Sequence, residues 1–113
     1  MYRATTPTHN FCFGEVDPND FKTILITYVQ NDRIVLEKGK NDLTITTEEV
    51  EGETHYHASL KLTQEETNLF SLQSGKTGSV YIQVRACDFD GNVVASNILK
   101  VSLLDVLNDE VLE

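Results

Sequence analysis

Apolar and polar residues alternate along much of this 113-residue chain, most regularly from position 79 to position 104. From Val80 to Ala86 every second residue is apolar, and a period of two places such residues on one face of a β-strand. Asp90-Gly91 follows, and glycine supplies the positive φ that a tight hairpin needs. A second alternating run completes the hairpin, and we expect its apolar members to share one face: Val93, Ala95, Leu99, Val101 and Leu103.

Shorter runs of strand character precede this hairpin, with turn-forming residues between them. The run from Phe21 to Gln30 is apolar on both faces near its middle, as expected of a central strand. About seven strands are expected, at residues 9–13, 21–30, 33–38, from 43 into an acidic stretch, 54–62, 79–88 and 93–104. Such spacing is typical of an immunoglobulin-like β-sandwich. We expect its core to contain Ile24, Ile26, Leu60, Ile82 and Val84.

One segment has the signals of a helix. Thr63 followed by Glu66 forms a capping box, in which each side chain satisfies a backbone N–H of the other residue. The acids of this turn also lie at the positive end of the helix dipole. The pattern predicts one short helix at about residues 63–70, within a single all-β domain that spans residues 1–113.

Charge is distributed unevenly along the chain, whose net charge is −9. Residues 48–53 and 105–113 together hold eight acids and no base, which leaves ten acids and nine bases elsewhere. Nucleic-acid binding requires a basic track, and this sequence has none. It also lacks an apolar run of the roughly 20 residues that span a bilayer and a secretory signal. We therefore expect no contact with nucleic acid or membrane, and a cytoplasmic location at synthesis.

The candidate metal ligands are His55 and His57, which lie two residues apart on one strand face. His9 is a conceivable third ligand, but no other donor joins them at a recognisable spacing. Two histidines on an exposed face more often only keep it hydrated. We therefore expect no metal and no cofactor. Asp88–Asn92 has the residues of a calcium loop, but its glycine is misplaced, so we interpret it as a turn.

Catalytic machinery is not recognisable in the sequence. A nucleophile elbow of the Gly-x-Ser-x-Gly type is absent, so we predict a protein without enzymatic activity or catalytic residues. Cys12 and Cys87 are far apart in sequence. A cytoplasmic origin favours two free thiols, whereas a disulfide would require their strands to lie side by side, so both states remain open.

The C-terminal tail, residues 105–113, places large apolar side chains among acids. Its apolar residues are Val106, Leu107, Val111 and Leu112. Left free, they would expose apolar surface, so the tail either packs on its own domain or is covered by a partner. We hypothesise that these four residues bind a neighbouring subunit.

Several segments resemble small proteins encoded in the tail modules of phages and prophages of gut Firmicutes. They are residues 1–11, 26–30, 62–67, 94–98 and 107–112. In size and strand pattern these proteins are similar to the immunoglobulin-like N-terminal domain of upper baseplate proteins of Gram-positive phages. The resemblance implies a non-enzymatic structural or assembly component of a tail or baseplate, present in the virion once assembled. Its partners would be other phage structural proteins or further copies of itself. The alternative is a carbohydrate- or ligand-binding β-sandwich module.

Overall fold

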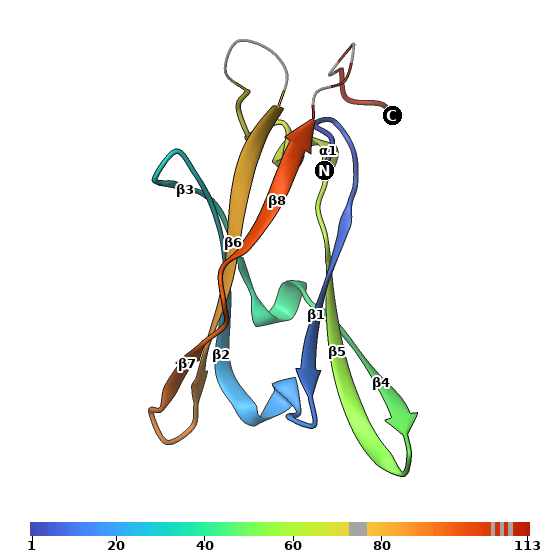
Figure 1. Cartoon of the computed structure of the whole chain (residues 1–113), viewed down its shortest axis with the longest axis vertical. Coiled ribbons are helices and arrows are strands. Elements are labelled where there is room, and N and C mark those ends of the chain that lie inside the picture. The colour runs from blue at the N-terminus through green and yellow to red at the C-terminus, as the bar shows by residue number, and fades with distance from the viewer. Residues whose placement is uncertain (73–76, 105, 107, 109) are drawn as a thin grey trace.

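Two antiparallel sheets face each other in this protein, as Figure 1 shows. The structure is a computed structural model that describes residues 1–72, 77–104, 106, 108 and 110–113. Its strands are β1 (Thr8–Gly14), β2 (Phe21–Gln30), β3 (Arg33–Gly39), β4 (Thr44–Val50), β5 (Glu53–Lys61), β6 (Thr77–Asp88), β7 (Val93–Ala95) and β8 (Leu99–Leu104). Short 3₁₀ turns lie at η1 (Pro18–Asp20) and η2 (Lys40–Asp42), and the described helix is α1 (Gln64–Thr67).

The order of the strands confirms the prediction of an all-β sandwich. The smaller sheet has the order β1-β5-β4, and the larger has the order β3-β2-β6, with β7 and β8 both paired to β6. These orders correspond to strands B-E-D and C′-C-F-G of a variable-type immunoglobulin domain. The segment before β1 lies beside β8, since Tyr2 and Leu104 form a parallel bridge and Leu104 N–H donates to the carbonyl of Met1 at 2.7 Å.

The core between the sheets contains four of the five residues expected there. Ile24, Ile26, Leu60 and Ile82 are all buried. Val84 shares their face but is only partly buried, which corrects the prediction for this residue. It lines an open groove at one side of the sandwich, which leaves part of its side chain accessible to solvent.

The helix forms where the capping box predicted it, but it is shorter than residues 63–70. The hydroxyl of Thr63 accepts from the N–H of Glu66 at 3.1 Å, and the carboxylate of Glu66 accepts from the N–H of Thr63 at 2.9 Å. Phe70 follows the helix as a buried residue. The helix ends early because the next bonds span three residues rather than four, from Leu69 N–H to the carbonyl of Glu66 at 3.1 Å and from Phe70 N–H to that of Thr67 at 3.4 Å. Among the described residues, no helix is long and apolar enough to cross a membrane.

The last expected strand is divided into β7 and β8 by a bulge at Ser96–Ile98. Ala95 pairs with Arg85 and Leu99 pairs with Ile82. Between these two pairs the β7–β8 segment contains one residue more than β6. One extra residue exchanges the faces of a strand. Val93 and Ala95 therefore lie on the outer face while Leu99, Val101 and Leu103 lie on the inner one. The expectation that all five share a face is wrong for this reason.

The acidic stretch forms a regular hairpin between β4 and β5. β4 continues to Val50, which pairs with Glu53 at the start of β5. Glu51 and Gly52 connect them with φ values of +53° and +83°, as in the two-residue turns that match strand twist. Most of the acids in this stretch are therefore held in strand geometry.

Candidate functional site

The outer face of the larger sheet carries a patch of exposed apolar side chains. Ile34, Tyr81 and Ile98 are 61%, 41% and 63% exposed. They surround a shallow hollow of about 500 Å³ together with Val29 and Thr27. Ile98 lies on this face because the next residue, Leu99, is the cross-strand partner of Ile82 on the inner face. Sequence reasoning missed the patch, because alternation alone places Tyr81 and Ile98 on the outer face but does not show that Ile34 of β3 lies beside them, which depends on the order of the strands.

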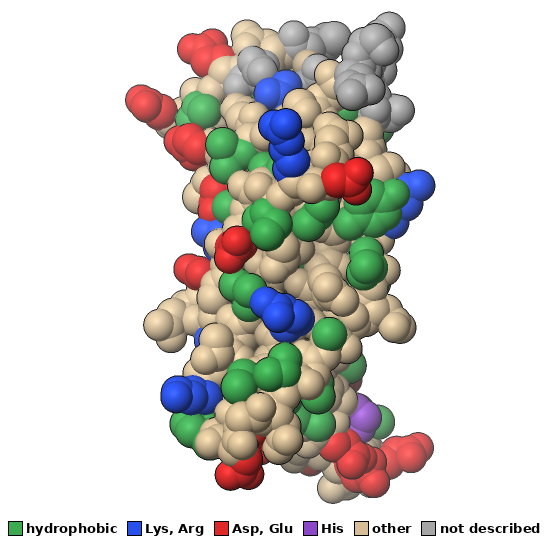
Figure 2. Space-filling model, turned by 90° about the vertical axis from the view of Figure 1, so that its left-hand side faces the viewer, with side chains coloured by type: hydrophobic (Ala, Val, Ile, Leu, Met, Phe, Trp, Pro, Cys, Tyr) green, Lys and Arg blue, Asp and Glu red, His purple; other side chains and the backbone are tan. Residues whose placement is uncertain are grey.

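Positive charge accompanies this patch. Arg85 lines the same hollow, and Lys100 is the cross-strand partner of Tyr81; both side chains are exposed. Asp32 lies at the edge of the hollow as its acidic member. Figure 2 shows hydrophobic side chains lying between Lys and Arg side chains on this side of the molecule. An apolar surface with bordering charges is typical of a protein contact site.

A second apolar feature is a groove at the side of the sandwich, between β1 and the β7–β8 edge. It has a volume of about 470 Å³ and includes Phe13, Phe21, Val94 and Leu99 in its lining. The rings of Phe13 and Phe21 pack with centroids 6.5 Å apart. Val94 and Leu99 remain about half exposed, because the groove is open to solvent between them and β1.

The C-terminal tail lies against α1 of its own chain. The side chain of Gln64 donates to the carbonyl of Leu112 at 2.8 Å and accepts from its N–H at 2.7 Å. Val106 and Val111 are partly buried, but the side chain of Leu112 is 75% exposed. Leu107, the fourth predicted partner-binding residue, lies outside the described residues. The contact thus holds the backbone of Leu112 without covering its side chain.

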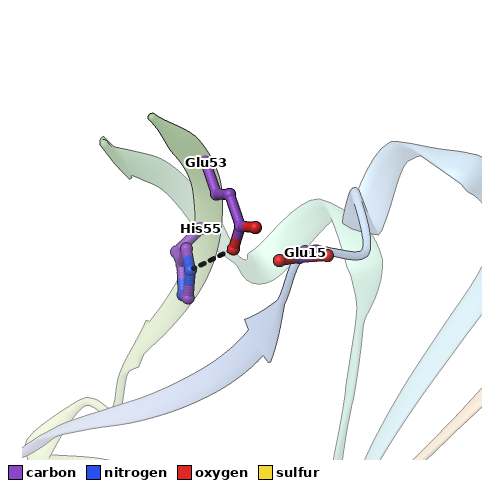
Figure 3. A group of neighbouring side chains, drawn as sticks. All are labelled: Glu15, Glu53 and His55. Carbon is purple, nitrogen blue, oxygen red and sulfur yellow. Dashed lines mark ion pairs between the residues drawn. The ribbon is translucent and has the colours of Figure 1, made fainter. Parts of the chain in front are cut away.

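The candidate metal ligands His55 and His57 both lie on the outer face of the smaller sheet, where they are partly exposed. His57 Nε2 is 3.4 Å from a carboxylate oxygen of Glu48, without the geometry of a hydrogen bond. His55 Nε2 is 3.9 Å from a carboxylate oxygen of Glu53. Figure 3 shows that Glu15, in the loop after β1, lies beside this second pair. The donor atoms of Glu15, Glu53 and His55 all lie within 4.8 Å of one another.

His9 is separated from the other two histidines by the sheet itself. It lies on the inner face of β1, where its Nδ1 is 2.7 Å from the hydroxyl of Tyr28 in a hydrogen bond. Burial, and secondly the positive charge of the Met1 α-ammonium, lower the pKa of His9. Burial and the charge of Glu66 raise the pKa of Tyr28. His9 is therefore a structural residue that connects the two sheets.

The Asp88–Asn92 segment forms the turn that the sequence predicts. The carboxylate of Asp88 accepts from the backbone N–H of Asp90 at 2.9 Å and from that of Asn92 at 2.8 Å. The Asn92 side chain adds a third bond at 3.1 Å. Hydrogen bonds from Asn92 are the largest cause that lowers the pKa of Asp88. The carboxylate thus stabilises the turn.

Both cysteines are free thiols. Cys12 lies on the smaller sheet opposite His57, and Cys87 lies on the larger sheet opposite Thr23. Each alternates with a buried neighbour, so both side chains are on outer faces of the sandwich. A disulfide between them is incompatible with this arrangement.

Comparison of the chain with models of protein families, with curated proteins and with solved structures finds no match.

Proposed function

We propose that this chain is a non-enzymatic assembly component that acts through protein–protein contacts. The observation that supports it is the exposed apolar patch formed by Ile34, Tyr81 and Ile98 on the outer face of the larger sheet. Burial of apolar surface contributes about 25 cal/mol per Å², so covering this patch is favourable. The segment that covers it, in this proposal, is the C-terminal tail of a second copy.

Charge complementarity is the reason for choosing the tail. Residues 105–113 contain four acids and no base, whereas the patch carries Arg85 and Lys100. Val111 and Leu112 lie directly between Glu110 and Glu113, so two apolar side chains are flanked by an acid on each side. Electrostatic complementarity of this kind sets orientation and partner choice. Leu112 remains exposed beside Gln64, so the contact with its own chain leaves apolar area available.

A contact between a tail and a sheet face joins two different surfaces. Heterologous contacts of this type close into rings or continue as filaments. Tails and baseplates of phages are repeated assemblies, and the resemblance of this sequence to phage and prophage tail-module proteins supports that location. We therefore propose a structural role in a tail or baseplate, with further copies or other virion proteins as partners.

Light scattering coupled to size-exclusion chromatography tests the proposal over a range of protein concentrations. The full chain should form oligomers, and both deletion of residues 106–113 and Ile98→Asp should make it monomeric. Glu65→Gln, an exposed change on α1, serves as the control that leaves assembly intact. A full chain that stays monomeric at all concentrations would contradict self-assembly.

Mixing the two defective variants tests which surfaces meet. The Ile98→Asp chain retains its tail, and the truncated chain retains its patch, so together they should form a 1:1 complex that cannot grow. If the truncated chain still oligomerises while Ile98→Asp does not, the patch binds another patch and the role of the tail is wrong.

The alternative function, a ligand-binding module, is favoured by the groove beside β1. Its walls include Phe13, Phe21 and Leu99, and its described lining contains no charged side chain. Such a groove suits an apolar ligand or an apolar face of a sugar. Screening of small apolar compounds and mono- and oligosaccharides by NMR should then shift the Leu99 methyl signals, and Leu99→Arg should abolish the effect. If no compound shifts these signals, the ligand-binding alternative loses its support.

A further inference from the structure

The cluster of Glu15, Glu53 and His55 lies at the outer face of the smaller sheet. The exposed apolar patch of Ile34, Tyr81 and Ile98 is on the other side of the molecule, on the larger sheet. Figure 3 shows the two carboxylates and the imidazole gathered beside one another. Their donor atoms lie within 4.8 Å of one another, although Glu15 is 38 residues before Glu53 in the sequence. The pairing of β1 with β5 produces this proximity, which no local spacing reveals.

Each member of the cluster is held by defined backbone structure. Glu53 follows the Glu51-Gly52 turn and pairs with Val50. His55 is two residues further along β5 and so projects from the same face. Glu15 follows Gly14, whose φ of +61° suits glycine, and the N–H of Val16 closes this turn on the carbonyl of Phe13 at 3.2 Å. Two turns and one strand therefore hold the backbone of the three donor residues in position without a bound metal ion.

We propose that Glu15, Glu53 and His55 bind one divalent transition-metal ion of the Zn²⁺ type. Zinc accepts imidazole nitrogen and carboxylate oxygen at about 2.0–2.2 Å, which places neighbouring donors roughly 3.0–3.5 Å apart. His55 Nε2 and Glu53 Oε2 are 3.9 Å apart. The three donor atoms lie within 4.8 Å of one another, so shifts of roughly 1–1.5 Å by the exposed Glu15 and Glu53 carboxylates toward His55 bring them to these distances.

The donor set indicates which metals are suitable. Ca²⁺ and Mg²⁺ prefer shells made of oxygen alone, whereas an imidazole with carboxylates suits zinc and its neighbours in the first transition row. Three protein donors leave at least one position for water or for a group from a neighbouring molecule. A divalent cation would also neutralise the repulsion between the two carboxylates.

A second pair lies next to the proposed site and adds to its negative potential. Glu48 is directly opposite His55 across the β4–β5 hairpin, and its carboxylate lies 3.4 Å from His57 Nε2. That nitrogen is shielded from solvent and makes no hydrogen bond in the described structure. Glu48 therefore supports the site electrostatically without being one of its three ligands.

Titration with ZnCl₂ of untagged protein tests the proposal, using calorimetry and imidazole NMR spectra. Binding should saturate at one ion per chain and shift the ring signals of His55 more than those of His9 and His57. His55→Ala and Glu53→Gln should each weaken binding at least about tenfold, or about 1.4 kcal/mol. Glu15→Gln should also weaken zinc binding, and this variant keeps both Glu53 and His55 of the β4–β5 hairpin. Because only binding to the folded state stabilises it, zinc should also raise the melting temperature.

Glu49→Gln is the matched control. It changes charge by the same amount on the same hairpin, but Glu49 pairs with Thr54 on the other face, so zinc affinity should stay unchanged. The proposal is overturned by an absence of saturable binding, or by equal affinity in His55→Ala. It is also overturned if Glu49→Gln weakens binding as much as Glu53→Gln, or if the shifts concentrate at His57. None of these results bears on the tail contact, which uses the opposite sheet.

Discussion

The side-chain amide of Gln30 pairs with the backbone of Ser71 much as neighbouring strands pair with each other. Its nitrogen donates to the carbonyl of Ser71 at 2.6 Å, and its oxygen accepts from the N–H of Ser71 at 2.7 Å. Gln30 is buried at the end of β2, so water does not replace these bonds readily. This pair connects the segment after α1 to the larger sheet.

Replacement of Gln30 by Leu should lower the free energy of unfolding by about 1–3 kcal/mol. The reason is that both backbone groups of Ser71 lose their partner in a partly buried position. Urea denaturation measures the change. Gln83→Ala is the control, since the side chain of Gln83 bonds to Ser96 near solvent and its loss should cost less than about 0.5 kcal/mol. Equal effects of the two variants would contradict a structural role for the Gln30 pair.

Ile82→Ala should lower the free energy of unfolding by about 2–5 kcal/mol, through lost burial and the cavity left behind. Ile82 is 2% exposed at the centre of the core. Ile98→Ala removes the same atoms from an exposed position, so under monomeric conditions it should cost less than about 0.5 kcal/mol. Chemical denaturation of both variants gives the comparison. A small effect at Ile82 would mean that the core does not pack around β6.

Stability should fall as the pH is lowered from neutrality toward 5, because His9 is harder to protonate in the folded chain. Its pKa lies below the ordinary 6.5, so between these two values the unfolded state binds more protons. The stabilisation is complete above about pH 6.5 and decreases as the pH falls toward the folded pKa. Thermal melts from pH 5 to 8 should show this slope.

His9→Gln provides the control for that slope. It retains a side chain able to hydrogen-bond to Tyr28 but does not titrate, so the dependence between pH 5 and 6.5 should flatten. An unchanged slope in this variant would assign the effect to groups other than His9.

Ser96→Ala should weaken the bulge between β7 and β8. The hydroxyl of Ser96 accepts from the N–H of Val84 at 3.0 Å, in place of a ladder bond. Its removal should cost about 0.5–1.5 kcal/mol and speed hydrogen exchange at the amide of Val84. Ser102→Ala on β8 is the control that should leave this amide protected. Unchanged exchange at Val84 would show that the side chain does not hold the bulge.

Local pattern in the sequence determined most of the strand faces and the start of the helix. The alternation from Val80 to Ala86 predicted the buried face of β6, because period two is a property of each extended strand by itself. The capping box predicted α1 for the same reason, since Thr63 and Glu66 lie one turn apart. The turn at Asp88–Asn92 was equally local.

Tertiary structure alone decided the surfaces on which the proposed functions depend. The order β3-β2-β6, with β8 paired to β6, brings Ile34 to the face that carries Tyr81 and Ile98. The bulge at Ser96 turns Val94 toward the groove beside β1, and a bulge depends on the partner strand rather than on the alternation of its own strand. Glu15 lies beside His55 only because β1 pairs with β5. The register of the same pairing places His9 opposite Leu60 on the inner face, away from the other two histidines. The alternation of side chains is a property of one strand and can be read from its own residues. The register between strands, and which residues lie close together, depend on which strands pair, and this pairing cannot be read from a single sequence.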